Sequence, residues 1–227
     1  MPFLYIDIET IPSQLDWVKK EIAEKITAPA NYKKAESIEK WFKDNGEDAT
    51  DDKWRKTSFD GSLGEIVAIS WAVDDGAPKV VSRGLGESEA VLLDEFFLEL
   101  QIDLTDKQNI THEPVWVGHY ITGFDLRFLW QRCVLNNIPP SVNIPYAAKP
   151  WDRQVFDTKI EWSGMQSTGS GSLDMVSKIM GYEGKGDIDG SKVWDYVKDG
   201  RIKEVAGYCK DDVEKCRRLH KRMIFLG

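Results

Sequence analysis

Residues 1–12 read MPFLYIDIETIP and combine the residue types of a buried strand with two carboxylates. A strand over residues 2–8 is predicted by the apolar side chains of Phe3, Leu4, Tyr5, Ile6, Ile8 and Ile11. Residues two apart share one face of a strand, so Asp7 and Glu9 point the same way. Two carboxylates about 4 Å apart repel by roughly 4 kcal/mol at an effective dielectric constant of about 20. We therefore expect one acid to be protonated or a cation to lie between them, unless the strand end emerges into solvent.

The rest of the sequence predicts an α/β fold with a mixed sheet. Further strands are predicted over 64–73, 78–83, 114–119 and 154–160. Helices are predicted over 87–100, over 123–137, from about Leu173, and over 202–224. Residues 13–62 are charged and carry apolar residues at helical spacing, so we expect a helical insertion between the first two strands. Because the strands first form a meander and later alternate with helices, the sheet should be mixed.

The last predicted helix places an acid on its apolar face. The apolar stripe consists of Val205, Cys209, Cys216, Leu219 and Met223. Asp212 continues this stripe, whereas Asp211 lies about 100° away on the polar face. That polar face consists of Glu204, Glu214, Lys215 and Arg218. Tyr208 precedes Asp212 by four residues, so the two share one side of the helix. Pairing of Asp212 with a buried arginine and plain core packing of Tyr208 are the structural alternatives. Buried acids without a partner are uncommon, so we favour a functional acid.

A further acid follows the strand predicted over 114–119. Asp125 lies in the first turn of the next helix, where the helix dipole favours a carboxylate for purely structural reasons. However, Asp125 also lies just past a buried strand end, and α/β proteins assemble their sites at such ends. In combination with the other acids, Asp125 is therefore a candidate site residue.

In this order, the acids resemble the three motifs of the DEDD superfamily of 3′-5′ exonucleases. The motifs are DIET with Asp7 and Glu9, HYITGFD with Asp125, and YCKDD with Tyr208 and Asp212. A tyrosine four residues before the last aspartate resembles the DEDDy branch. The chain is similar, over nearly its whole length, to stand-alone exonucleases related to the proofreading domain of family B DNA polymerases. The segments GEIVAIS, GHYITGFDLRFL and GKGDIDGSKVWDYV add to this resemblance.

The resemblance implies a ribonuclease H-like fold, with a mixed five-stranded sheet flanked by helices. It also implies a single exonuclease domain over residues 1–227, with residues 13–62 as a helical insertion. Two divalent cations, Mg²⁺ or Mn²⁺, are implied as cofactors.

The resemblance also assigns a role to each site residue. Asp7 would bridge both ions, Glu9 and Asp212 would complete the tighter site, and Asp125 would hold the second ion. Tyr208 would orient the attacking water. The product would be a nucleoside 5′-monophosphate released from a 3′ end.

Five residues are candidate substrate contacts: Thr10, His119, Phe124, Leu173 and Lys185. His119 stands where the resembled group usually has asparagine, and it either binds a phosphate or holds its loop. Phe124 and Leu173 either pack against terminal bases, as single-strand binders do, or belong to the core.

The resemblance implies nucleic acid as the partner, and we expect the 3′ end of single-stranded DNA. Exoribonuclease activity is an alternative, because the motifs do not show how the 2′-hydroxyl is read. An inactive nucleic-acid-binding module is another, although four acids facing phosphates argue against it. A replication or recombination partner is a further expectation, without an identity.

Composition narrows the class of protein without identifying the substrate. The net charge of -8 would disfavour nucleic acid, unless the acids hold cations. Three cysteines without CxxC spacing disfavour a disulfide framework or a thiolate zinc site and favour a reducing cytoplasm. We expect no membrane span and no signal peptide. The resemblance suggests a bacterial or phage-infected cell.

Overall fold

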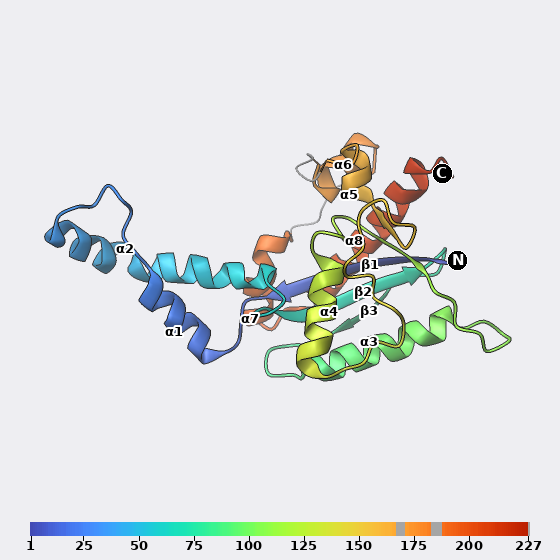
Figure 1. Cartoon of the computed structure of the whole chain (residues 1–227), viewed down its shortest axis with the longest axis horizontal. Helices are drawn as coiled ribbons and strands as arrows, with labels where there is room; N and C mark the ends of the chain where they lie inside the picture. Colours follow the sequence, from blue (N-terminus) through green and yellow to red (C-terminus); the bar gives the residue numbers. More distant parts are fainter. Residues whose placement is uncertain (167–170, 183–187, 227) are drawn as a thin grey trace.

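Five strands form one mixed sheet in the order β3-β2-β1-β4-β5. Figure 1 labels β1, β2 and β3 of this sheet. Their bounds are β1 Phe3–Ile11, β2 Glu65–Val73, β3 Lys79–Ser82, β4 Val115–Gly118 and β5 Val155–Asp157. β1, β2 and β3 pair in antiparallel fashion, whereas β1, β4 and β5 run parallel. This computed structural model describes residues 1–166, 171–182 and 188–226. The mixed five-stranded sheet predicted from the sequence is confirmed.

Helices cover both faces of the sheet. α3 (Glu89–Leu104) and α4 (Asp125–Asn136) pack on one face. The other face is covered by α6 (Leu173–Ile179), α7 (Val193–Lys198) and α8 (Ile202–Met223). The remaining helical segments are α1 (Asp16–Lys25), α2 (Ala35–Arg55), η1 (Lys56–Phe59), α5 (Thr158–Trp162) and η2 (Gly190–Lys192). Within the described ranges, no helix has both the length and the apolar character that a membrane crossing requires.

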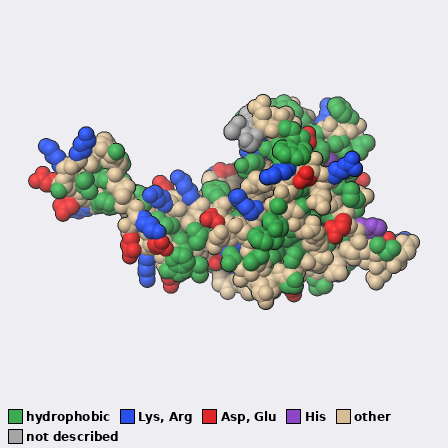
Figure 2. Space-filling view, in the orientation of Figure 1, with side chains coloured by type: hydrophobic (Ala, Val, Ile, Leu, Met, Phe, Trp, Pro, Cys, Tyr) green, Lys and Arg blue, Asp and Glu red, His purple; other side chains and the backbone are tan. Residues whose placement is uncertain are grey.

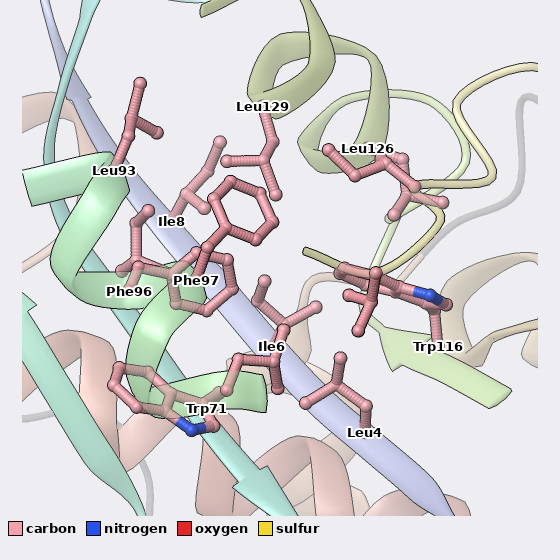
Figure 3. Packing of buried hydrophobic residues seen from close by; sticks show 14 of the residues in the cluster. Leu4, Ile6, Ile8, Trp71, Leu93, Phe96, Phe97, Trp116, Leu126 and Leu129 are labelled. Carbon is pink, nitrogen blue, oxygen red and sulfur yellow. The ribbon is translucent and has the colours of Figure 1, made fainter. Parts of the chain in front are cut away.

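β1 is the central strand, and its alternating side chains enter two different cores. The cluster beneath α3 and α4 receives Leu4, Ile6 and Ile8 (Figure 3). Tyr5 enters the opposite cluster, which α6 and α8 cover. Asp7 and Glu9 follow Tyr5 at the same spacing, and side chains alternate between the faces of a strand. The fold therefore directs both acids toward α8.

The segment between β1 and β2 forms a helical arm, as the sequence predicted. α1 and α2 project from the sheet (Figure 1), and the arm carries interspersed basic and acidic side chains (Figure 2). Its root is fixed by three hydrogen bonds. Trp54 Nε1 donates to the Ser13 carbonyl oxygen at 2.9 Å, and Ser13 N donates to Thr57 Oγ1 at 2.8 Å. Thr10 Oγ1 donates to the Ser58 carbonyl oxygen at 2.7 Å. These contacts bind the base of the arm to the end of β1.

The strand predicted over 154–160 is too long. β5 ends at Asp157, and α5 begins at Thr158. The Asp157 carboxylate accepts hydrogen bonds from the backbone N–H groups of Lys159 and Ile160, and it thereby caps the helix. The sequence suggests a strand here because valine, phenylalanine and isoleucine surround this aspartate. The hydrogen bonds from the Asp157 cap stabilise a helix from Thr158 instead of a continued strand.

His220 lies on α8 and is buried in the core against β1. It is 1% exposed, and its Nδ1 lies 2.9 Å from the Tyr5 hydroxyl. The rings of Phe3 and Phe156 contact it edge-on, with centroids 4.6 and 4.5 Å away. Burial, and secondarily the charge of Lys221, lower the pKa of His220 from 6.5 to about 4. The native protein therefore holds this imidazole neutral.

We predict that this histidine makes stability depend on pH between 6.5 and about 4. Above pH 6.5 the side chain is neutral in both states, and its contribution to stability is complete. As the pH falls toward 4, the unfolded chain binds a proton that the native core refuses, so the free energy of unfolding decreases by up to about 3 kcal/mol. Urea unfolding of the parent and of His220→Gln across this range measures the effect.

The quantity to compare is the parent curve minus the variant curve, since other titrating groups cancel in that difference. The parent should lose more stability than His220→Gln as the pH falls. Parallel curves would contradict the prediction.

Candidate active site

α8 crosses the face of β1 that carries Asp7 and Glu9, and it brings Asp212 to them. The Cys209 thiol donates a hydrogen bond to the Asp7 carbonyl oxygen, with 3.3 Å between Sγ and O. Carboxylate oxygens of Asp7, Glu9 and Asp212 lie within 4.8 Å of one another. Oxygen ligands of this kind suit Mg²⁺ and Mn²⁺. The three acids are therefore a candidate metal site.

Asp7 has the most unfavourable electrostatic position of the three. Its Oδ2 is buried and has no hydrogen-bond partner among the described residues. Burial raises the pKa of Asp7 well above its usual value, and the charges of Glu9, Asp212 and Asp125 raise it further. A bound cation would favour the charged form instead. An unpartnered oxygen beside two other carboxylates fits a divalent cation.

Asp125 approaches this cluster from the start of α4. It is 7% exposed, and its charge contributes to the raised pKa of Asp7. Burial raises the pKa of Asp125 to about 7, and Asp157 adds to this, while a backbone hydrogen bond from Ile8 opposes it. Asp125 does not belong to the group within 4.8 Å. It is a neighbouring acid that could serve a second cation.

Asp157 positions the turn that leads to Asp125, and sequence reasoning did not find it. It is fully buried, at the end of β5. Its Oδ1 accepts from Tyr120 N at 3.0 Å, and its Oδ2 accepts from Thr122 N and Oγ1 at 3.0 and 2.7 Å. The same carboxylate caps α5, so one side chain joins two segments. The signal in the sequence was an Asp-Thr pair at a strand end, which is also typical of a helix cap.

Tyr208 lies beside the acids on α8. It is 9% exposed, and its hydroxyl hydrogen-bonds the Asp212 carboxylate. Burial, followed by the charges of Asp212, Glu9 and Asp7, raises the pKa of Tyr208. The hydroxyl therefore stays protonated and can act as a hydrogen-bond donor, not as a base.

Lys215 is the second residue that sequence reasoning missed. The helical pattern assigns it to the polar face of α8, yet its side chain is only 12% exposed. Its Nζ lies 2.8 Å from Asp212 Oδ1 and forms an ion pair across one helical turn. The spacing of three residues between the aspartate and the lysine was the available signal. Asp212 is thus paired with a lysine, not with the arginine considered as its structural alternative, while Asp211 is exposed.

Thr10 and His119, two candidate substrate contacts, have partners within the protein. Thr10 donates its hydroxyl hydrogen to the carbonyl oxygen of Ser58. His119 Nδ1 lies 3.0 Å from Thr158 Oγ1, and Nε2 lies 3.0 Å from the Gly171 carbonyl oxygen. Burial lowers the pKa of His119, which favours a neutral ring. These contacts support the expectation that His119 holds its loop.

The other candidate substrate contacts differ from one another. Phe124 is half-buried against the rings of Phe59 and Phe128. Leu173 is 8% exposed and packs in the cluster beneath α8, which corresponds to the core alternative. Lys185 lies outside the described residues.

A pocket of about 450 Å³ opens beside the acids. Its lining consists of Asp7, Ile8, Phe59, His119, Tyr120, Gly123, Phe124, Asp125 and Arg127. A Cβ at Gly123 would lie 2.4 Å from the Tyr120 ring, so a larger residue here would require that exposed ring to move. A larger hollow of about 940 Å³ lies between α1 and α2, and its lining comes from the arm. The acids therefore identify the smaller pocket as the candidate site.

Comparison with known proteins gives a family match and a structural likeness. Residues 59–226 match a family model described as a predicted 3′-5′ exonuclease related to the exonuclease domain of PolB. No curated protein matches the chain significantly. The fold is similar to the family B DNA polymerase from the hyperthermophilic archaeon Pyrobaculum calidifontis, with a TM-score of 0.59 and 16% sequence identity. That alignment covers 99% of this chain and 24% of the polymerase chain, so the chain spans about a quarter of the polymerase.

We predict that Lys215 weakens cation binding at the three-acid cluster. Its ammonium group is held 2.8 Å from one oxygen of Asp212, so it competes with a cation and repels it. Lys215→Met should bind Mn²⁺ at least about tenfold more tightly, a difference of about 1.4 kcal/mol. Isothermal titration calorimetry of the metal-free protein measures this affinity.

Two variants test whether the charge near Asp212 is responsible. Lys215→Arg keeps the charge and should retain the parent affinity for Mn²⁺. Lys203→Met removes an exposed charge from the same helix and should change little. Unchanged or weaker binding by Lys215→Met would show that the lysine does not compete with the cation.

Proposed function

The chain belongs to a family of predicted 3′-5′ exonucleases related to the exonuclease domain of PolB, and from this premise we propose that it is a metal-dependent 3′-5′ exodeoxyribonuclease. It hydrolyses the terminal phosphodiester of a DNA 3′ end and releases a nucleoside 5′-monophosphate. The observation that carries the proposal is the meeting of Asp7, Glu9 and Asp212, with one oxygen of Asp7 left unpartnered.

Two divalent cations, Mg²⁺ or Mn²⁺, fit the acids of this site. Asp7, Glu9 and Asp212 would hold the first ion, and Asp7 and Asp125 the second. Such ions supply Lewis-acid stabilisation of the negative charge that develops during phosphodiester hydrolysis. The chain contributes the arrangement: β1 and α8 hold three carboxylates together before any substrate arrives.

Tyr208 positions groups at the site and does not accept a proton from the substrate. Its raised pKa keeps the hydroxyl protonated, and that hydroxyl already bonds Asp212. From this position Tyr208 orients the attacking water and fixes the Asp212 carboxylate.

The pocket supports a preference for unpaired ends. Its volume of about 450 Å³ lies within the range of small-molecule sites, which suits one nucleotide. Aromatic rings and the exposed Arg127 line it together with Asp7 and Asp125. Aromatic stacking surfaces next to a basic side chain such as Arg127 are typical of sites that bind single-stranded nucleic acid. The whole chain acts as one exonuclease domain in this proposal.

The substrate class is tested with single- and double-stranded DNA and RNA labelled at the 5′ end. With Mg²⁺ or Mn²⁺, single-stranded DNA should yield a ladder that shortens from the 3′ end, and EDTA should abolish it. A ladder from RNA alone would favour the exoribonuclease alternative. Internal cuts, or cleavage that persists in EDTA, would contradict the proposal.

The role of the acids is tested with Asp7→Ala. Removal of a shared ligand should lower nucleotide release by more than about 100-fold, since losses at outer-shell partners of metal sites already reach 10–100-fold. In EDTA the melting temperature should be retained or should rise, because the variant removes a carboxyl group whose ionisation is opposed by burial and by the neighbouring acids.

Asp211→Ala is the matched control, because it removes an exposed acid one position from Asp212 on α8. It should cleave as the parent does. If Asp7→Ala releases nucleotides at the parent rate, the assigned site is wrong.

A further inference from the structure

We propose that the helical arm contributes a base-stacking wall to the active site through Phe59. This inference rests on the proposed function and identifies what the pocket recognises: the unpaired base of the terminal nucleotide. Phe59 ends η1, the last helical turn before β2, and it lines the same pocket as Asp7 and Asp125.

Phe59 is an exposed aromatic residue close to the acids. It is 64% exposed, whereas Thr57 and Gly61, two positions away in each direction, are buried. Exposure of a phenylalanine ring to water is unfavourable, and the free-energy cost is proportional to the exposed apolar area. Here the ring faces a pocket beside the acids, where a ligand can cover it.

The turn that carries Phe59 is fixed to β1, the strand of the catalytic acids. The Ser58 carbonyl oxygen accepts from Thr10 Oγ1 at 2.7 Å, and Thr57 Oγ1 accepts from Ser13 N at 2.8 Å. Gly64 allows the chain to return closely, because a Cβ there would lie 2.7 Å from the Thr57 carbonyl oxygen. The backbone of the turn that carries Phe59 is therefore anchored to the end of the strand that carries Asp7.

Phe59 and Phe124 form one aromatic surface. Their ring centroids lie 6.4 Å apart with an interplanar angle of 64°, so the rings meet edge to face. Phe124 directly precedes Asp125 in the sequence. The pocket thus extends from buried carboxylates to a rim with an exposed ring and the exposed guanidinium group of Arg127. A terminal nucleotide has the matching parts, with a phosphate for the acids and their cations and a base for the rings.

This surface selects unpaired bases without selecting their sequence. Every base offers a π-face to an aromatic ring, whereas no base-edge donors are needed. A base in a duplex is already stacked and paired. The class of ligand is therefore a single-stranded 3′ terminus whose last residue carries a base.

The test compares strands that differ only in their last base. Binding of a fluorescein-labelled DNA single strand is measured by anisotropy with Mg²⁺ present, in an Asp7→Ala background that prevents cleavage. One strand has a normal 3′-terminal nucleotide, and the other has an abasic one. Adding Phe59→Ala should weaken binding of the normal strand about tenfold and leave the abasic strand unchanged.

Two further variants separate stacking from structure. Phe42→Ala, also in the arm and exposed but outside the acid-lined pocket, should bind both strands as its background does. Phe59→Leu keeps apolar bulk without an aromatic ring and should behave as Phe59→Ala. Melting temperatures confirm that each variant is folded.

The outcomes that overturn the inference differ from those that overturn the proposed function. Equal binding of the normal strand with and without Phe59→Ala, equal weakening on both strands, full binding by Phe59→Leu, or no binding of any strand would overturn the stacking role. Absence of nucleotide release by the parent protein overturns the proposed function instead. The anisotropy comparison decides on Phe59 in either case.

Discussion

The mutual repulsion of carboxylates on β1 and α8 is the constraint on which the rest of the structure depends. Asp7, Glu9 and Asp212 would separate if they were free, yet they lie within 4.8 Å of one another. Apolar packing opposes this repulsion, because α8 is anchored to the sheet through the stripe that contains Val205 and Leu219, both fully buried. The hydrophobic core thus keeps the three carboxylates close together in spite of their electrostatic repulsion. If this site binds a cation, as proposed, its ligands are already assembled, which lowers the cost of ordering them on binding.

The second half of the site depends on a polar framework, not on apolar packing. Asp157 joins the turn after β4 to the start of α5, and His119 links the same turn to the carbonyl oxygen of Gly171. Asp125 starts its helix at the end of this framework. The acids are therefore positioned in two different ways. Apolar packing beneath α8 positions Asp212, and a hydrogen-bonded turn positions Asp125. The Asp157 carboxylate accepts hydrogen bonds from the turn, whereas a His119 ring nitrogen donates to the Gly171 carbonyl oxygen.

The sequence predicted the parts of the site that periodicity determines. Alternation places Asp7 and Glu9 on one face of β1, and helical spacing separates buried Asp212 from exposed Asp211. The family and the mixed sheet inferred from these residues are confirmed, whereas the metal and substrate roles stay proposals. Lys215 escaped the periodic argument because a long side chain can fold back from a polar face. The helix at Thr158 escaped because a single cap overrode strand propensity. Phe59 reaches the pocket through contacts between distant segments, which no local pattern reports.

The hydrogen bond between Thr10 and Ser58 at the root of the arm has a consequence for how the length of the arm can vary. Thr10 lies near the end of β1 and Ser58 lies in η1 before the chain enters β2, and one hydrogen bond joins these two points. A loop whose ends are already joined places little constraint on its own length, because closure entropy grows only slowly with the number of residues. The outer part of α1 and α2 is therefore free to lengthen, shorten or acquire a new surface while β1 and its acids stay where they are. The root of the arm, which carries Phe59 to the pocket, must stay attached to the strand of the acids, whereas the distant parts of α1 and α2 carry no such constraint.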